Sequence, residues 1–489
     1  MQQSYDVVII GGGVVGSAIA RELSRYKLRI AVLEKESDVC TQTSGRNTGM
    51  LHAGFLYKTG SLKAICAVEG NQEFDQVARE LDVPFKRTGK LIVGFTDEHR
   101  QRLEQFMARG EANGVKGLEL IDRKRMDELD PSAGGNFAMW CPASGILDPF
   151  LYTIALAENA VHNGAEYHLN CAFTGETRQA DGTHLLHTTR GDFHTRWVVN
   201  SAGLNSAVVS GQLGIPGYVI KPVKGEYFVL DKLAGQFAKI PVYPAPNPDN
   251  TFDTHATPTV DGNVLVGPDS HWRGISRTTS PPRPPWTASL RAVRGCSSTW
   301  TAPTSSAILS ASGPSASTPP PARYRTSYSE CRDEAPGVVN LVGIESPGVT
   351  SALPLARRAV ALIARQEALE PNPDFDPIRH GIRRFADMAD EERAAAIAEN
   401  PDYGEIFCRC EKVTKAEILQ AIHNPLGVHT VNGIKVRTRA TMGRCQGGYC
   451  ETRITEALHR ELGEDFRDIH LGPEGSWMFT GSVKGGEPA

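Results

Sequence analysis

Four of the ten cysteines in this chain of 489 residues stand in two short pieces near its C-terminus. "FCRC" holds Cys408 and Cys410, and "RCQGGYC" holds Cys445 and Cys450. Such thiols could bind zinc, form disulfides, ligate an iron–sulfur cluster or be grouped by chance. Structural zinc favours two to four residues between paired cysteines, so the C-x-C spacing is unusual for zinc, although zinc stays an alternative. The glycines of the second pair let backbone amides turn toward sulfur, as they do around redox clusters.

A second pattern, at the other end of the chain, predicts a dinucleotide site. In "VVIIGGGVVGSAIARELSRYKLRIAVLE" an apolar strand leads into G-x-G-x-x-G and a helix. Gly11 permits the tight turn, Gly13 lets the backbone approach a pyrophosphate, and Gly16 lets the helix pack on the strand. A second strand ends in Glu34, which would hold ribose hydroxyls and repel a 2′-phosphate.

Composition narrows the class of protein. The length predicts two or three domains, and 40% hydrophobic residues can fill large cores. A net charge of -4 gives no reason to expect nucleic-acid binding. No apolar run is long enough to span a bilayer, and the N-terminus enters a strand without room for a signal peptide. We therefore expect a cytoplasmic protein, whose reduced thiols disfavour disulfides.

Three further motifs bring small and hydrogen-bonding residues to the ends of expected strands. They are "SGRNTGMLHAG", "VVNSAGLNS" and "VVNLVGIESPGVTSALPLA", the last of which is a strand, a glycine-rich turn and a helix. Their candidate cofactor-binding residues are Ser44, Arg46, Asn47, Ala202, Gly203, Gly343, Gly348 and Thr350.

These motifs resemble the FAD-dependent D-amino-acid-oxidase-like superfamily, and within it the group of glycerol-3-phosphate and L-2-hydroxyglutarate dehydrogenases. The resemblance covers residues 5–272 and resumes at about 333. It implies an α/β fold with a Rossmann-like FAD-binding domain and an antiparallel-sheet substrate domain. The C-terminal cysteines resemble the bacterioferritin-associated-ferredoxin-like [2Fe-2S] domain, which implies a small α-rich Fe–S domain, as in the anaerobic A-subunit type of the dehydrogenase.

The resemblance divides the chain into domains. We expect an FAD-dependent oxidoreductase domain over 1–370, a linker over 371–402, a ferredoxin-like domain over 403–465 and a tail over 466–489. Within the first, the FAD part takes about 1–80, 150–210 and 333–370. The substrate part takes about 80–150 and 210–332.

An alcohol dehydrogenase of this kind needs a base beside the flavin and a cation for an acidic substrate. His52, in the segment that the family places along the flavin, is the first candidate base, and His255 matches a family position near the substrate. Lys224 is the candidate anion-binding cation, because its strand should border the substrate chamber.

The resulting hypothesis is an FAD enzyme that oxidises a small anionic secondary alcohol and passes electrons through a [2Fe-2S] cluster. The first substrate is sn-glycerol 3-phosphate, which would give dihydroxyacetone phosphate, and L-2-hydroxyglutarate is the alternative. The acceptor would be a quinone or a partner subunit, with peripheral membrane contact at most. Two other classes remain: an FAD-dependent amino-acid or amine oxidase, and a zinc-clamped flavoprotein scaffold without activity.

Residues 276–329 depart from the family pattern. The stretch is rich in Ser, Thr, Pro and Arg, has no Asp, Glu or Lys, and shows no helix or strand periodicity. A disordered insert is one interpretation. Because the stretch replaces family-like sequence, our hypothesis is a reading-frame excursion that begins near 276, ends near 331 and removes a substrate-binding arginine.

Overall fold

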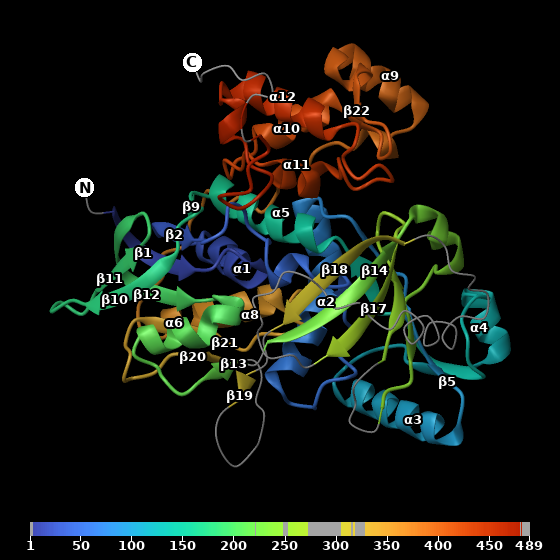
Figure 1. The fold of residues 1–489 in the computed structure, drawn as a ribbon. Helices are drawn as coiled ribbons and strands as arrows, with labels where there is room; N and C mark the ends of the chain where they lie inside the picture. The colour runs from blue at the N-terminus through green and yellow to red at the C-terminus, as the bar shows by residue number, and fades with distance from the viewer. Residues whose placement is uncertain are drawn as a thin grey trace.

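The structure is a computed structural model that describes residues 3–220, 222–247, 253–271, 305–313, 316–317, 328–479 and 481. The side chains of a few of these residues, including Lys224, lie outside the description. The chain folds into two large sheets with helices around them and a smaller C-terminal domain (Figure 1).

The first sheet is the Rossmann-like part. Its strand order is β10-β11-β12-β1-β2-β9, and β21 lies beside β12 with β20 at its other edge. β1 is parallel to β2 and β12, β2 is parallel to β9, and β12 is parallel to β21. The strands are β1 (Gln3–Ile10), β2 (Ile30–Leu33), β9 (Glu166–His168), β10 (Phe173–Arg178), β11 (His184–Thr188), β12 (Gly191–Asn200), β20 (Tyr328–Glu330) and β21 (Val338–Val342).

Five helices of the described chain surround this sheet, with α6 against β10, β12 and β21. α1 packs on α5 and α8, and α2 packs on both of those helices. The apolar run of β1 and the small residues of α1 are buried because the helix lies directly on the strands. The helices are α1 (Val14–Leu23), α2 (Leu62–Leu81), α5 (Pro149–His162), α6 (Ser206–Gln212) and α8 (Ala352–Ala364).

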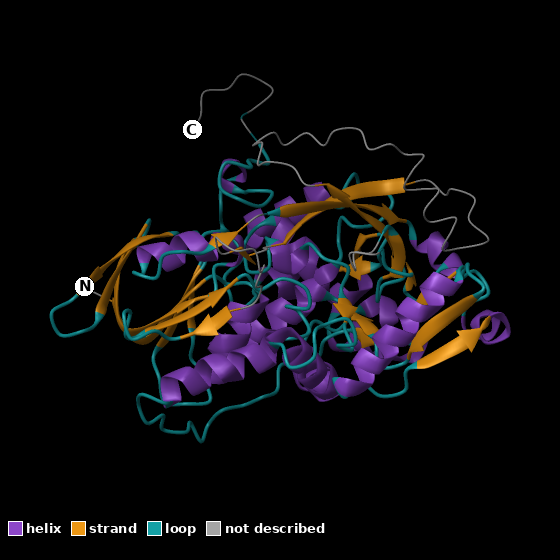
Figure 2. Ribbon diagram, turned by 90° about the horizontal axis from the view of Figure 1, so that it is seen from below, coloured by secondary structure: helices purple, strands orange, loops and turns teal. Residues whose placement is uncertain are grey.

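The second sheet has the order β18-β14-β17-β16-β15-β5-β7-β6. Figure 2 shows the strands of the described chain in orange and the helices around them in purple. Its neighbouring strands are antiparallel except β15 and β5, which agrees with the largely antiparallel sheet that was predicted. The strands are β5 (Lys90–Gly94), β6 (Glu119–Asp122), β7 (Phe137–Cys141), β14 (Val223–Leu230), β15 (Val242–Pro244), β16 (His255–Pro258), β17 (Val264–His271) and β18 (Ser305–Gly313). Helices α3 (Asp97–Ala112) and α4 (Arg123–Leu129) pack beside β5, β6 and β7.

A small sheet of β3 (Met50–Leu51), β8 (Gly145–Leu147) and β4 (Phe85–Lys86) accompanies the two large ones. β13 (Val219–Ile220) pairs with β19 (Ala316–Ser317).

The C-terminal domain has its own apolar core and lies against α5 (Figure 1). Its α10 begins after Thr414, whose hydroxyl accepts from the Glu417 amide, while the Glu417 carboxylate accepts from the Thr414 amide. This reciprocal cap fixes the start of α10. The elements are β22 (Ile406–Cys408), β23 (Val413–Thr414), α9 (Asp390–Glu399), α10 (Lys415–Ile422), α11 (Val431–Thr438) and α12 (Glu451–Leu462).

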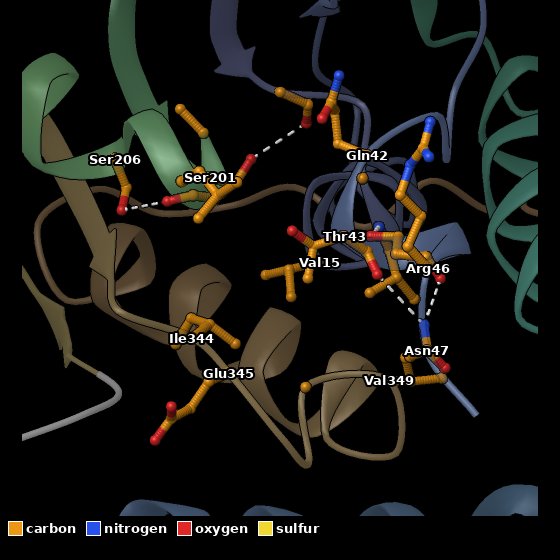
Figure 3. Close-up of a pocket in the computed structure, with 18 of the residues that line it drawn as sticks. Val15, Gln42, Thr43, Arg46, Asn47, Ser201, Ser206, Ile344, Glu345 and Val349 are labelled. Carbon is orange, nitrogen blue, oxygen red and sulfur yellow. Dashed lines mark hydrogen bonds between the residues drawn. The ribbon is translucent and has the colours of Figure 1, made fainter. Parts of the chain in front are cut away.

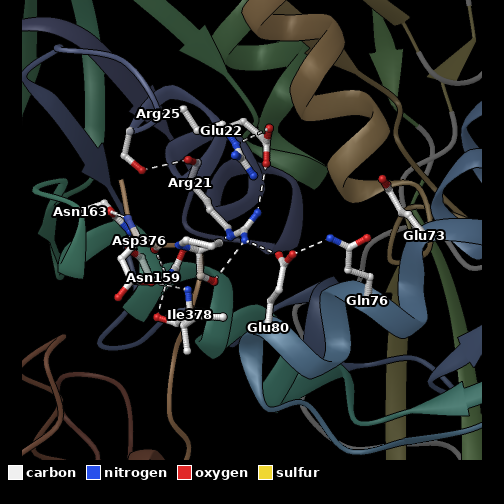
Figure 4. Close-up of polar contacts among 12 residues, drawn as sticks. Arg21, Glu22, Arg25, Glu73, Gln76, Glu80, Asn159, Asn163, Asp376 and Ile378 are labelled. Atoms are coloured by element: carbon white, nitrogen blue, oxygen red, sulfur yellow. Dashed lines mark hydrogen bonds and ion pairs between the residues drawn. The ribbon is translucent and has the colours of Figure 1, made fainter. Parts of the chain in front are cut away.

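A buried arginine joins the segment before this domain to the Rossmann-like part (Figure 4). The Arg21 side chain, 1% exposed, donates to the carboxylates of Glu22 and Glu80 and to the amide oxygen of Asn159. Asn159 in turn donates to the carbonyls of Asp376 and Ile378. The segment between the two domains is therefore fixed by hydrogen bonds that leave few of these polar atoms unpaired.

Most of the anomalous stretch 276–329 lies outside the described residues. Although this stretch shows no strand periodicity, its residues 305–313 form β18, which pairs antiparallel with β14. Backbone hydrogen bonds form the pairing, so a strand can be added to a sheet edge without the side-chain alternation that sequence analysis uses. No helix in the described part of the chain is long and apolar enough to cross a membrane.

Candidate functional site

A cavity of about 810 Å³ runs from the glycine-rich turn after β1 to the second sheet (Figure 3). In the close-up, side chains from the first 50 residues, from the turn after β12 and from the segment after β21 surround one space. Of the predicted cofactor residues, those that line the cavity are Gly11, Gly13, Glu34, Ser44, Arg46, Asn47, Ala202, Gly203 and Gly348.

The glycine-rich turn has the geometry that its spacing predicts. Gly11 has φ +108°, and a β-carbon on Gly16 would lie 1.9 Å from the Gly11 carbonyl oxygen. Gly13 precedes the first residue of α1, and Gly13, Val14 and Val15 line the cavity, so the N-terminus of the helix stands at its wall. A β-carbon on Gly13 would lie 3.0 Å from the Ser44 hydroxyl oxygen, so glycine keeps this turn open and the cradle fits a pyrophosphate.

Glu34 lies at the end of β2, where its carboxylate accepts from the amides of Gly12 at 2.7 Å and Glu36 at 3.0 Å. Burial raises the pKa of Glu34, and the two amides oppose that shift. An acceptor fixed in this way can receive hydrogen bonds from ribose hydroxyls.

The 40–57 segment folds over the start of α1. The Ser44 hydroxyl accepts from the Val14 amide at 2.9 Å. Asn47 donates to the Ser44 carbonyl at 2.7 Å and accepts from the Gly49 amide, while Arg46 donates to the Thr41 carbonyl. Arg46 and Asn47 therefore shape their own loop, and they also line the cavity.

Three predicted cofactor residues stand behind the cavity wall. Gly16 packs α1 on β1, and Gly343 makes the turn after β21 with φ +70°. Thr350 is 2% exposed, and its hydroxyl accepts from the His52 amide at 3.0 Å and donates to the Met50 carbonyl. Thr350 thus joins the segment before α8 to β3 and to His52, which follows that strand.

The structure brings His52 and His255 to the same cavity, at its end near the second sheet. Nε2 of His52 is 3.3 Å from the Ser346 hydroxyl. His255 stacks on Tyr243 with ring centroids 3.7 Å apart, and its Nδ1 is 3.3 Å from the Asp253 carbonyl. Burial lowers the pKa of each histidine to about 3, and the Lys90 charge adds to the shift. Both imidazoles are therefore neutral near pH 7.

Lys90 is a cavity residue that sequence analysis missed. Its ammonium lies 3.3 Å from the centroid of the Tyr243 ring. The signal was present in "TGKLIVG", where a lysine opens a strand that is buried at every position. Lys224, the cation that was proposed, lies on β14, but its side chain is outside the described part of the structure.

The four C-terminal cysteines lie in two pairs. Cys410 and Cys445 are exposed with sulfurs 3.6 Å apart, and Cys408 and Cys450 are buried and hydrogen-bonded to each other. The Cys450 thiol lowers the pKa of Cys408 to about 6, and a backbone amide at Tyr449 lowers that of Cys445.

This donor set fits a two-iron cluster, in which each iron takes two thiolates. Backbone amides of Glu411 and Thr441 point at the Cys408 sulfur, and that of Gly447 points at Cys445. Among the described residues, no three His, Cys, Asp or Glu side chains converge as ligands of a single metal ion. Two pairs favour the cluster over the zinc alternative.

Comparison with known families agrees with this geometry. The family described as FAD dependent oxidoreductase matches residues 6–362, and the BFD-like [2Fe-2S] binding domain matches residues 406–460. The chain therefore belongs to the FAD dependent oxidoreductase family and carries a C-terminal [2Fe-2S] domain. The predicted cofactors and the α/β fold with an added Fe–S domain are confirmed.

Among curated proteins, the chain is 36% identical over 487 residues to a glycerol 3-phosphate dehydrogenase of Caloramator mitchellensis, covering 98% of this chain and 99% of that relative. It is 35% identical over 277 residues to the mitochondrial L-2-hydroxyglutarate dehydrogenase of Caenorhabditis briggsae. That match covers 54% of this chain and 63% of the relative.

Solved structures share the fold of the catalytic part. The L-alpha-glycerophosphate oxidase of Mycoplasma pneumoniae, solved with FAD bound, superimposes with a TM-score of 0.70 at 24% identity, over 77% of this chain and 99% of its own. The glycine oxidase of Geobacillus kaustophilus gives 0.62 at 21% identity, over 78% of this chain and 100% of its own. At these identities the likeness describes the fold alone.

Proposed function

We propose that this protein oxidises the secondary alcohol of sn-glycerol 3-phosphate to dihydroxyacetone phosphate. The observation that carries the proposal is the similarity to a glycerol 3-phosphate dehydrogenase over nearly the whole of both chains, including the C-terminal domain. The cavity supports it, because two neutral histidines and a buried lysine line the end near the second sheet.

In this proposal the residues of the chain hold the substrate and move one proton. FAD, held at the glycine-rich turn and along residues 44–50, supplies hydride acceptance when it is bound. His52 is neutral at working pH, so its Nε2 can take the hydroxyl proton as the carbon is oxidised. Ser346, 3.3 Å from that nitrogen, would orient the ring. His255 is the second candidate for the base.

A [2Fe-2S] cluster held by Cys408, Cys410, Cys445 and Cys450 supplies single-electron transfer when it is bound. The acceptor that we propose is a quinone or a partner subunit. Such a partner would keep this cytoplasmic protein at the inner face of the membrane by peripheral contact.

L-2-Hydroxyglutarate is the second candidate substrate, because the catalytic part is 35% identical to a dehydrogenase of that acid. The two substrates share a secondary alcohol and an anionic group, so both suit a base beside a cation.

The test is the visible spectrum of the purified holoprotein without oxygen. We expect sn-glycerol 3-phosphate to bleach the flavin band, and His52→Asn to slow bleaching by about 10²-fold or more, since a general base contributes that much. Bleaching by L-2-hydroxyglutarate alone would select the second candidate. A flavin that neither compound reduces would overturn the proposal.

A further inference from the structure

The four cluster cysteines are not equally accessible from solvent. Cys410 and Cys445 are exposed with their sulfurs 3.6 Å apart, whereas Cys408 and Cys450 are buried. The exposed pair is therefore the side of the cluster site that another protein can reach. Because electrons pass between proteins only when the redox centres come close, an external acceptor has to dock on the surface around Cys410 and Cys445.

An arginine and a tyrosine lie in contact beside this exposed pair. The guanidinium carbon of Arg409 is 4.3 Å from the centroid of the Tyr449 ring, and that of Arg453 is 5.8 Å away. Tyr449 is 39% exposed and lies between Cys445 and Cys450 in the chain. Arginine and tyrosine are enriched at the centres of protein interfaces, where they offer a large contact area. The cation–π contact holds both side chains in place before a partner arrives.

The charges around the exposed pair are mainly positive. Arg409 and Lys412 are exposed, and neither pairs with a carboxylate in the described part of the chain. Arg444, next to Cys445, is also exposed and pairs with Asp231 of the catalytic part at 2.9 Å. Glu451, at the start of α12, is partly buried. Two exposed cations therefore remain available to an acidic surface.

Nearby carboxylates are already paired within the chain. The Glu411 side chain is 5% exposed and pairs with Lys232 at 2.7 Å and with Arg439 at 2.9 Å. Glu405 pairs with Arg453. These acids are held by their own cations, so they do little to repel an acidic partner.

We propose that the docking surface formed by Arg409, Lys412, Arg444 and Tyr449 binds an acidic one-electron carrier protein against the exposed cysteine pair. The inference rests on the proposed function, in which electrons leave through the [2Fe-2S] cluster, and it names the chemistry of the partner. Oxidation of one secondary alcohol to a ketone releases two electrons and two protons. Two carrier molecules take one electron each, and the protons go to solvent.

A carrier protein fits this surface better than a membrane does. Electrostatic binding to anionic lipid uses clusters of about four to eight basic residues, more than Arg409 and Lys412 supply. A carrier that docks, takes an electron and leaves needs only a small, weak interface, in which charge complementarity speeds the encounter.

The first experiment measures how electron transfer depends on salt. The holoprotein is reduced with dithionite without oxygen, freed of excess reductant and mixed by stopped flow with oxidised cytochrome b5, an acidic acceptor, or with cytochrome c, a basic one. With cytochrome b5 the second-order rate constant should fall on the order of 10-fold between about 50 and 500 mM salt, because screening removes the attraction. With cytochrome c it should stay level or rise. A rate constant for cytochrome b5 that salt does not lower would overturn the inference.

A double variant assigns this effect to the docking surface. Arg409→Gln with Lys412→Gln should keep the iron content per flavin, reduce cytochrome b5 on the order of 10-fold more slowly at low salt, and lose most of the salt dependence. Lys124→Gln with Arg460→Gln removes two exposed cations elsewhere, on α4 and α12, and is the matched control. If the first variant has the same salt dependence as the control, the docking surface is wrong.

Cross-linking locates the contact on the wild-type protein, without any substitution. A carbodiimide joins carboxylates of cytochrome b5 to lysine amines that lie against them, and mass spectrometry identifies each lysine. Lys412 should dominate the cross-linked peptides, while Lys124, which is also exposed, should stay unlinked. Cross-links spread evenly over the exposed lysines would contradict the proposed surface.

The remaining outcomes separate this inference from its alternatives. If the holoprotein sediments with phosphatidylglycerol vesicles through Arg409 and Lys412, while cytochrome b5 shows no salt dependence, the surface contacts a membrane and the inference fails. Because dithionite supplies the electrons, the result does not depend on the alcohol. If docking behaves as expected but sn-glycerol 3-phosphate does not bleach the flavin, the inference stands and the proposed substrate is wrong.

Discussion

His255 has one ring nitrogen near the Asp253 carbonyl, and its Nε2 is buried without a hydrogen-bond partner in the described structure. Its ring also stacks on Tyr243, so the orientation of the imidazole is fixed. A neutral imidazole held in this way keeps an acceptor directed at the cavity, and a proton on it would be costly in free energy.

The pH dependence of stability follows from this burial. The folded pKa of His255, about 3, lies below the ordinary value of 6.5, so between these values the unfolded chain binds one more proton. Stability therefore falls as the pH is lowered through this window. We expect His255→Gln to reduce the slope of the free energy of unfolding by about 1.4 kcal/mol per pH unit.

Urea unfolding at several pH values between about 4 and 6 measures this slope. His162→Gln is the control, because that histidine is 61% exposed and lies at the surface beside Asp376. A His255→Gln slope equal to that of wild type would contradict the prediction.

The roles of single residues could be predicted from the sequence where the spacing of a motif requires a particular residue type. Gly16 has to be glycine because a β-carbon there would lie 1.9 Å from the Gly11 carbonyl oxygen, and the G-x-G-x-x-G motif contains this glycine. Lys90 could not be placed at the cavity in this way, because Tyr243 and His255 are more than 150 positions away in the chain and come near it only in the folded sheet.

At the scale of elements, the loop before Cys445 is pressed against the C-x-C knuckle. A β-carbon on Gly443 would lie 2.2 Å from the β-carbon of Cys410. The second cysteine pair can approach the first only because this position has no side chain.

We therefore expect Gly443→Ala to push the two cysteine segments apart and weaken cluster binding on the order of 10-fold or more, as changes around metal ligands do. Iron and sulfide content per flavin, with the visible spectrum, measures the loss. Gly404→Ala is a matched control in the same domain, since its new β-carbon would meet Ile397 at an ordinary 3.5 Å. Equal iron content in the two variants would refute the steric argument.

Helices and strands could be predicted only where the signal lies in neighbouring residues. Thr414 and Glu417, three positions apart, mark the start of α10, and the capping box that they form is present. The strand β18 has no such signal, because its position is set by the neighbouring β14 and not by its own side chains.

At the scale of the whole molecule, a buried ion pair joins the two domains. Arg437 of α11 donates to both carboxylate oxygens of Asp38, at 2.6 and 3.1 Å, and both side chains are at most 5% exposed. Arg439 adds hydrogen bonds to Asp261 and Asn263. The domain that carries the cysteines is thus held against the catalytic part by charges excluded from water.

Arg437→Met would leave the Asp38 carboxylate buried and unpaired, at a cost of about 3–5 kcal/mol to the docked arrangement. We expect flavin reduction by substrate to keep its rate, while electron transfer to an external one-electron acceptor slows. Stopped-flow measurement of each half-reaction separates the two effects.

Two further variants complete this test. Arg437→Met with Asp38→Leu should recover much of the loss, because replacing both partners by apolar groups removes the unpaired charge. Arg460→Met, with its side chain 76% exposed, should behave as wild type. If Arg437→Met alone transfers electrons at the normal rate, the Arg437–Asp38 pair does not hold the domains in place.

The reading-frame hypothesis for residues 276–329 concerns the coding sequence and so affects the whole molecule. We expect that translating its coding DNA in one of the other two frames gives family-like sequence, including an arginine in the substrate part. Resequencing the gene and expressing the corrected frame measures the effect on flavin reduction. If neither alternative frame resembles the family, the excursion hypothesis is wrong.

Because one cysteine pair is exposed and the other is buried, thiol labelling can measure whether the cluster is bound. In metal-free protein, a brief exposure to an alkylating reagent should modify Cys410 and Cys445 first, since both are exposed and the pKa of Cys445 is lowered. Cys40, Cys66, Cys141 and Cys171 are buried, with raised pKa values, and should stay unmodified while the protein is folded. Mass spectrometry of those two cysteines would then report cluster occupancy directly, even in a crude extract where the flavin spectrum is hidden.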